Sequence, residues 1–120
     1  MTNKKKVILT EDDSAIQDAI KMILQSAGYA VTVFSNGDNL VKGNYDIPDL
    51  FILDKQLSGV DGLDVCSLIK SKPDTAKVPI IIISASPQVA PAAFKAGANA
   101  FLEKPFKRRE MLELVNGLIT

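Results

Sequence analysis

Histidine is missing from this chain of 120 residues, and cysteine occurs once, at Cys66. Without histidine the chain cannot build a Ser-His-Asp or Cys-His catalytic site, a histidine-ligated zinc site or a phosphohistidine of its own. A single cysteine excludes an internal disulfide and a thiolate metal cluster. We expect Cys66 to be a core residue, because it lies on the apolar face of a predicted helix.

Net charge is lacking as well, since 14 Lys and Arg residues balance 14 Asp and Glu residues. No overall field draws such a chain to nucleic acid or to a membrane surface, so we expect direct contact with neither. The sequence shows no run of about 18 apolar residues and no apolar signal-peptide region. We therefore expect a soluble cytoplasmic protein.

What the sequence does contain is a regular alternation of strand-like and helix-like segments. Short apolar runs predict strands at residues 7–10, 30–34, 50–53, 80–83 and 100–103. Helical spacing and helix end signals predict helices at residues 14–27, 38–42, 63–71, 87–97 and 108–119. This alternation is typical of a parallel sheet with helices on both faces. We predict one α/β domain over residues 1–120, a flavodoxin-like (βα)5 doubly wound parallel sheet with strand order 2-1-3-4-5.

Carboxylates follow two of these strands directly. Glu11 and Asp12 come after the first strand, and Asp54 comes after the third. In the predicted order the ends of these strands flank the switch point of the sheet, where ligands bind. Three clustered carboxylates repel one another unless a cation holds them, and oxygen ligands suit Mg²⁺ or Mn²⁺. The acids therefore predict a metal site.

Two further polar residues follow the other strands of this edge. Ser84 ends the fourth strand and Lys104 follows the fifth. A nucleophilic acid, a metal site, a hydroxyl and an ammonium together suit phosphoryl transfer to a carboxylate. We therefore predict that Asp54 attacks phosphorus and becomes an acyl phosphate.

Simpler interpretations stand beside these. Glu11 and Asp12 would also favour a helix N-terminus, where acids interact well with the dipole. Phe101 suits a core position as well as any functional one, and Lys104 before Pro105 suits a surface turn. Asp61 is predicted to be a structural turn residue. Gly59 and Gly62 are predicted to lie where side chains would obstruct the loop.

Four segments carry a resemblance to a known family: VILTEDD, LFILDKQLSGVDG, PIIIISAS and AFLEKPF. Each lies at a strand end, and together they resemble the signature segments of bacterial response-regulator receiver domains, over about residues 5–119. The resemblance implies a metal site of Glu11, Asp12, Asp54 and the backbone carbonyl of Gln56. It also implies these roles: Asp54 as the phosphorylated aspartate, Ser84 as the switch hydroxyl, Phe101 as the aromatic switch residue and Lys104 as the phosphate-pairing lysine, with a cis peptide bond before Pro105.

The family further implies partners and a mode of action. A sensor histidine kinase or a phosphotransfer protein would supply the phosphoryl group to Asp54. The phosphorylated chain would then change the surface of its fourth helix, fifth strand and last helix, toward an unidentified output protein or attached output domain, and a homodimer through that surface is possible. The resemblance implies a signalling protein rather than an enzyme, with at most slow autodephosphorylation. A receiver-like interaction module that is never phosphorylated is the alternative.

Two positions and one stretch of the chain depart from the family pattern. Ser58 stands where a proline is usual, which predicts a less rigid loop. Phe101 lacks the hydroxyl of the tyrosine common at its position. The stretch between Ser84 and Lys104 is shorter than typical and holds two prolines, so the fourth helix is the element that the sequence supports least.

Overall fold

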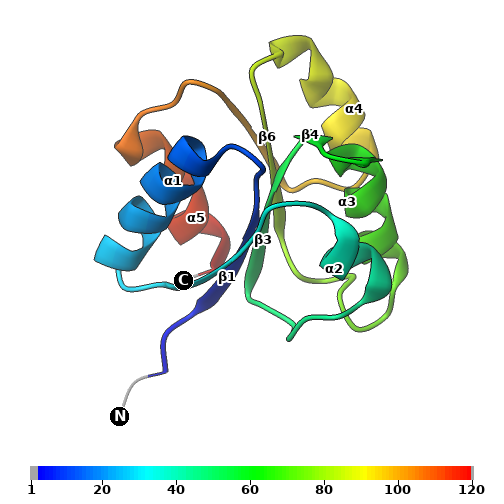
Figure 1. The fold of residues 1–120 in the computed structure, drawn as a ribbon, viewed down its shortest axis with the longest axis horizontal. Helices are drawn as coiled ribbons and strands as arrows, with labels where there is room; N and C mark the ends of the chain where they lie inside the picture. The colour runs from blue at the N-terminus through cyan, green and yellow to red at the C-terminus, as the bar shows by residue number, and fades with distance from the viewer. Residues whose placement is uncertain (1–2, 120) are drawn as a thin grey trace.

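The computed structural model describes residues 3–119, which form a central sheet between two layers of helices (Figure 1). The strands of this sheet are β1 (Lys6–Thr10), β2 (Ala30–Phe34), β3 (Leu50–Asp54), β6 (Ile80–Ser84) and β7 (Ala100–Glu103). The helices are α1 (Ser14–Ser26), α2 (Asp38–Lys42), α3 (Gly62–Ser71), α4 (Ala90–Lys95) and α5 (Arg108–Ile119). Residues 1–2 and 120 of the predicted domain lie outside the described residues.

The order of the strands confirms the predicted topology. Within the described residues the sheet runs β2-β1-β3-β6-β7, and all neighbouring strands are parallel. Numbered among themselves, these strands lie in the flavodoxin-like order 2-1-3-4-5. The switch point therefore falls between β1 and β3, and the carboxyl ends of both strands open onto it.

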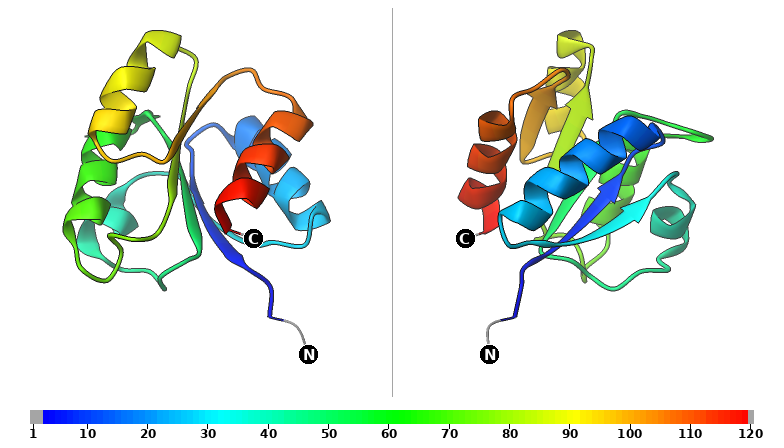
Figure 2. Two further views of the ribbon diagram at one scale, coloured as in Figure 1. Left: turned by 180° about the vertical axis from the view of Figure 1, so that it is seen from behind. Right: turned by 60° about the vertical axis from the view of Figure 1, so that its left-hand side comes forward.

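Helices cover both faces of the sheet, and two apolar clusters fill the space beneath them. Figures 1 and 2 show α1 and α5 against one face and α2, α3 and α4 against the other. Side chains alternate along β1, so that Val7 and Leu9 join the cluster under α1 and α5 while Ile8 joins the other. Such strands, buried on both faces, need continuous apolar runs, and the residues Ile80–Ile83 are fully buried.

Cys66 is a core residue, as predicted. It is fully buried on α3, and burial raises the pKa of its thiol to about 11, although the charge of Lys70 opposes this effect. The thiol is therefore protonated at neutral pH and packs as a small apolar group. No helix within residues 3–119 has the length and apolar character that crossing a membrane requires.

A short antiparallel hairpin that the sequence pattern does not predict follows β3. Its strands are β4 (Gln56–Leu57) and β5 (Val60–Asp61), each too short to show a periodicity. Gly59 in the turn has a φ of +82°, a conformation that favours glycine, but a Cβ there would meet no atom within 4 Å, so the obstruction predicted for this position is absent. Lys55 Nζ pairs with Asp61 Oδ2 at 3.0 Å. The loop that lacks the family's proline is thus closed by strand pairing and an ion pair.

The segment between β6 and β7 forms a short helix, the element with the weakest support in the sequence. A 3₁₀ turn, η1 (Pro87–Val89), precedes α4, which spans Ala90–Lys95. Pro87 is the first residue of η1 and Pro91 the second residue of α4, and in the first turn of a helix a proline removes no needed donor. Neither N-terminus has a side-chain cap.

One buried hydroxyl is left without a partner in the described part of the chain. Thr10 at the end of β1 is fully buried, and its Oγ1 makes no hydrogen bond. Because a buried, unpaired hydroxyl costs free energy, we expect Thr10→Val to raise the free energy of unfolding by about 1 kcal/mol. Urea unfolding measures this. Thr32→Val on the exposed side of β2 is the control, with a change within about 0.5 kcal/mol, and a destabilised Thr10→Val variant would contradict the expectation.

Candidate functional site

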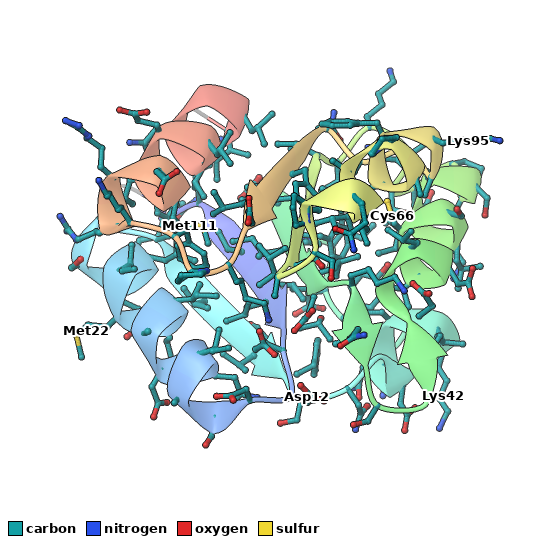
Figure 3. All side chains as sticks on the ribbon, turned by 90° about the horizontal axis from the view of Figure 1, so that it is seen from above. Asp12, Met22, Lys42, Cys66, Lys95 and Met111 are labelled. Carbon is teal, nitrogen blue, oxygen red and sulfur yellow. The ribbon has the colours of Figure 1, made fainter. Side chains whose placement is uncertain are left out.

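The polar residues singled out in the sequence meet at the carboxyl edge of the sheet, which Figure 3 shows from above with Asp12 labelled. Asp54 is the last residue of β3 and Ser84 the last of β6, while Glu11 directly follows β1 and Lys104 directly follows β7. The sequence places Asp54 just after its strand, whereas it is part of β3. These side chains line a cleft of about 270 Å³, together with Asp12, Gln56 and Ser86.

Lys104 connects the two buried carboxylates of the cleft. Its Nζ lies 2.8 Å from Asp54 Oδ2 and 3.2 Å from Glu11 Oε1. The Lys104 N–H donates to the Ser84 carbonyl at 2.8 Å, and the peptide bond to Pro105 is cis, as the family resemblance implies. Burial by itself would lower the pKa of the Lys104 ammonium, but its hydrogen bonds and charge pairing with Asp54 and Glu11 outweigh burial and raise that pKa.

Glu11 is the most deeply buried acid of the cleft, at 1% exposure. Burial raises the pKa of its carboxyl group to about 7, with a further contribution from its hydrogen bond with Asp54 and from the charge of Asp54. The N–H of Asp13 and the ammonium of Lys104 act in the opposite direction. Near neutral pH the Glu11 carboxyl group therefore holds a proton for part of the time, which relieves its repulsion with Asp54.

This raised pKa predicts a pH dependence of stability. The carboxyl pKa in the folded chain, about 7, exceeds the ordinary value of 4.5, so the folded state binds the proton more tightly. This contribution is fully present below about pH 4.5 and is lost as the pH rises toward 7. Relative to Glu11→Gln, the wild-type free energy of unfolding should fall by up to about 3 kcal/mol between about pH 4.5 and pH 8. Urea unfolding across this range measures the difference, and parallel curves for the two proteins would contradict it.

The carboxylates offer a set of oxygen ligands for a metal ion. Oxygen atoms of Glu11, Asp12 and Asp54 lie within 4.8 Å of one another. Asp12 is exposed at the rim, so an ion there could keep several waters, as Mg²⁺ does. Gln56 lines the same cleft, and its N–H donates to Asp54 Oδ1 at 3.0 Å. The use of its carbonyl as a ligand stays a prediction.

Ser84 is buried and lines the cleft. Its Oγ accepts a hydrogen bond from the N–H of Ser86 at 3.0 Å. Because this bond uses an acceptor lone pair, the Ser84 hydroxyl proton remains free to donate to a group in the cleft.

Phe101 does not line this cleft. It is half-buried on β7 and packs against the apolar cluster under α2, α3 and α4. Its position agrees with the core interpretation of the sequence, and its role as a switch residue stays a prediction.

The structure also adds contacts that the sequence does not reveal. The side-chain amide of Gln17 on α1 donates to the Glu11 carbonyl and, at 3.2 Å, to Ser35 Oγ. The Ser58 hydroxyl donates to Asp12 Oδ2 at 3.2 Å. The serine at the position where the family usually has proline is the sequence feature that could have indicated the contact between Ser58 and Asp12. No sequence pattern indicates the contacts of Gln17.

An apolar groove adjoins the cleft on the side of α1. It has a volume of about 530 Å³ and shares Ile16, Ala85 and Lys104 with the cleft. The remainder of its lining comes from α1 and from the segment after β7: Ala15, Ala19, Ile20, Ile23, Pro105 and Phe106. A partner that reaches Asp54 from this side would therefore pass over an apolar surface.

Comparisons with known proteins show the family of the chain. Residues 7–116 match the family model of the response regulator receiver domain. The transcriptional regulatory protein ResD of Bacillus subtilis is 34% identical over 121 residues, which cover 98% of this chain and 49% of ResD. The chain thus spans about half the length of the curated relatives it matches.

Solved structures show the same fold. The receiver domain of the sensor histidine kinase PA1611 from Pseudomonas aeruginosa is 29% identical, with a TM-score of 0.89 and 98% coverage of both chains. That protein has a magnesium ion coordinated in its active-site cleft. The receiver domain of the Francisella response regulator 1452 is 28% identical, with a TM-score of 0.86 and 97% coverage of both chains.

Proposed function

This chain belongs to the response regulator receiver domain family of two-component signalling, and we propose that it accepts a phosphoryl group on Asp54. One observation carries the assignment to Asp54. The ammonium of Lys104 lies 2.8 Å from the Asp54 carboxylate, at the point where Glu11 and Asp12 supply further oxygen ligands. A scaffold that only binds a partner gains nothing from gathering repelling carboxylates around one lysine.

The proposed step is a transfer between two nucleophiles. An oxygen of the Asp54 carboxylate attacks phosphorus, and a P–O bond forms while the P–N bond of a donor phosphohistidine breaks. The electron pair of the broken bond leaves with the imidazole nitrogen. Lys104 would pair with a phosphoryl oxygen, and the Ser84 hydroxyl would donate to another. Because residues 1–120 contain no histidine, the donor is a phosphohistidine that lies outside these residues or a small acyl phosphate.

The residues present fit a divalent cation. We propose that Glu11, Asp12, Asp54 and the Gln56 carbonyl hold Mg²⁺, with Mn²⁺ as a possible substitute, since all these ligands are hard oxygen atoms. The ion would supply positive charge that offsets the repulsion between the carboxylate and the incoming phosphoryl group. The magnesium ion in the PA1611 receiver domain supports this proposal.

We propose that the phosphorylated chain signals through α4, β7 and α5. Phe94 on α4 is 52% exposed, unusual for a phenylalanine, and α4 lacks a side-chain cap. This surface would bind an output protein, an attached output domain or a second copy of the chain, and residues 1–120 would act as one receiver domain. The donor would be a sensor histidine kinase or a phosphotransfer protein, and neither nucleic acid nor a membrane would contact this domain.

Intact mass spectrometry tests the proposal. The wild type is incubated with acetyl phosphate and Mg²⁺, beside an Asp54→Asn variant and a sample with EDTA. We expect a gain of one phosphoryl group by the wild type with Mg²⁺, and no gain in the other two samples. An unmodified wild type would favour the receiver-like module that is never phosphorylated, and an equal gain by Asp54→Asn would place the acceptor elsewhere.

A further inference from the structure

Asp12 differs from the other two acids of the cleft in how it is held. Glu11 and Asp54 are buried, and both contact the Lys104 ammonium. Asp12 is exposed, and among the hydrogen bonds and ion pairs of residues 3–119 its carboxylate has a single one, with the Ser58 hydroxyl. An exposed carboxylate next to two other acids would otherwise turn toward solvent, because repulsion drives it there.

Ser58 is placed for this contact by the hairpin that follows Asp54. Ser58 and Gly59 form the turn between β4 and β5, and Leu57 pairs with Val60 across it. The Lys55–Asp61 ion pair lies at the base of the hairpin. The Ser58 hydroxyl therefore reaches Asp12 from a loop whose backbone is fixed on both sides.

The contact also joins two segments that are distant in the sequence. Asp12 belongs to the loop between β1 and α1, whereas Ser58 lies in the loop that begins at the acceptor Asp54. With its Oδ2 bound to Ser58, the Asp12 carboxylate is restrained while its second oxygen remains available to a cation. Hydrogen bonds to metal-binding carboxylates orient them and strengthen metal binding.

We propose that Ser58 is a positioning residue that orients Asp12 for the divalent cation. This inference rests on the metal site of the proposed function and assigns that site a hydroxyl outside the ligand set. Alanine and proline at position 58 cannot make the bond, because neither side chain has a donor. Threonine retains it. The orientation of Asp12, and through it the affinity for Mg²⁺, thus depends on a single hydroxyl.

Calorimetric titration with MgCl₂ tests the inference on the wild type and on Ser58→Ala, Ser58→Thr and Ser58→Pro. We expect Ser58→Ala and Ser58→Pro to raise the Kd for Mg²⁺ by about three- to tenfold, the effect of one hydrogen bond to a charged group, and Ser58→Thr to stay within about twofold of wild type. Ser71→Ala is the matched control, since the Ser71 hydroxyl bonds within α3 to the Leu68 carbonyl and should leave the Kd unchanged.

A second readout requires no metal. NMR couplings report the χ1 rotamer of Asp12, which should be dominated by one state in the wild type and averaged in Ser58→Ala. Wild-type affinity in Ser58→Ala would overturn the inference and leave the proposed function intact. Restored affinity in Ser58→Pro would also overturn it, because loop rigidity rather than the hydroxyl would then control Asp12. A wild type that binds no Mg²⁺ would overturn the metal site and this inference together.

Discussion

Replacing Lys104 by methionine is expected to slow phosphorylation of Asp54 by about 100- to 1,000-fold, the usual effect of removing one charged group that stabilises a transition state. The methylene and sulfur atoms of methionine keep much of the lysine's bulk, so the variant removes mainly the ammonium. That ammonium contacts both Asp54 and Glu11, at 2.8 and 3.2 Å. Without the ammonium, no positive charge on this side of the cleft offsets the repulsion between the negatively charged phosphoryl group and the carboxylates.

The same variant should also lose stability, in a pH-dependent way. Two buried carboxylates would lose their shared cation, which we expect to cost up to about 3 kcal/mol above neutral pH. The pKa of Glu11, already raised to about 7, would rise further, so that protonation relieves most of the loss near about pH 5. The rate of phosphorylation at about pH 5 and pH 8 should therefore be compared with the stability that urea unfolding measures at the same pH values.

Lys107→Met is the control for this experiment. The Lys107 side chain is exposed after β7, and it forms none of the ion pairs within residues 3–119. We expect its rate of phosphorylation by acetyl phosphate and its stability to match the wild type. A Lys104→Met variant that is phosphorylated within about threefold of the wild-type rate would contradict the role proposed for Lys104.

Gly62→Ala is expected to lower the free energy of unfolding by about 3 kcal/mol or more. A Cβ at this position would lie 2.0 Å from the Asp54 carbonyl oxygen and 2.9 Å from Lys55 Cα, so the backbone itself would have to move. Overpacking of this kind costs about 1–3 kcal/mol even where side chains can adjust. The shift would displace the Asp54–Lys55 peptide and break the 2.7 Å hydrogen bond from the Gly62 N–H to the Lys55 carbonyl. The extent of Asp54 phosphorylation should fall as the stability of the fold falls.

Gly117→Ala is the control, and it is expected to change the free energy of unfolding in the opposite direction. Gly117 lies within α5, and a Cβ there would meet no atom within 4 Å. Because glycine is unfavourable inside a helix, this substitution should raise stability by about 0.5–1 kcal/mol. Urea unfolding of both variants makes the comparison. A Gly62→Ala variant as stable as the wild type would show that the close approach of α3 to β3 is not needed.

The sequence was sufficient for the topology because buried parallel strands require apolar runs, and those of β3 and β6 are unmistakable. It was also sufficient for the position of Asp54 and Lys104, because parallel strands end at one edge of the sheet. The hairpin β4–β5 could not be predicted, since strands of two residues have no period and depend on the turn at Gly59.

Contacts between particular side chains were the second feature that could not be predicted from the sequence. The strand order predicts that Lys104 and Asp54 lie at the same edge of the sheet, but it does not predict their 2.8 Å contact. The bond from Ser58 to Asp12 depends on the exact path of a loop. The raised pKa of Glu11 likewise depends on how deeply the residue is buried, which the pattern of neighbouring residues does not reveal.

Locating the phosphoryl group is the most direct test of the central claim. The wild type is treated with acetyl phosphate and Mg²⁺ and then with sodium borohydride, which reduces an aspartyl phosphate to homoserine, and its peptides are sequenced by tandem mass spectrometry. We predict homoserine at position 54 alone, and none after treatment without Mg²⁺. Homoserine at another acid, or intact aspartate at position 54 throughout, would contradict the claim that Asp54 is the phosphoryl acceptor.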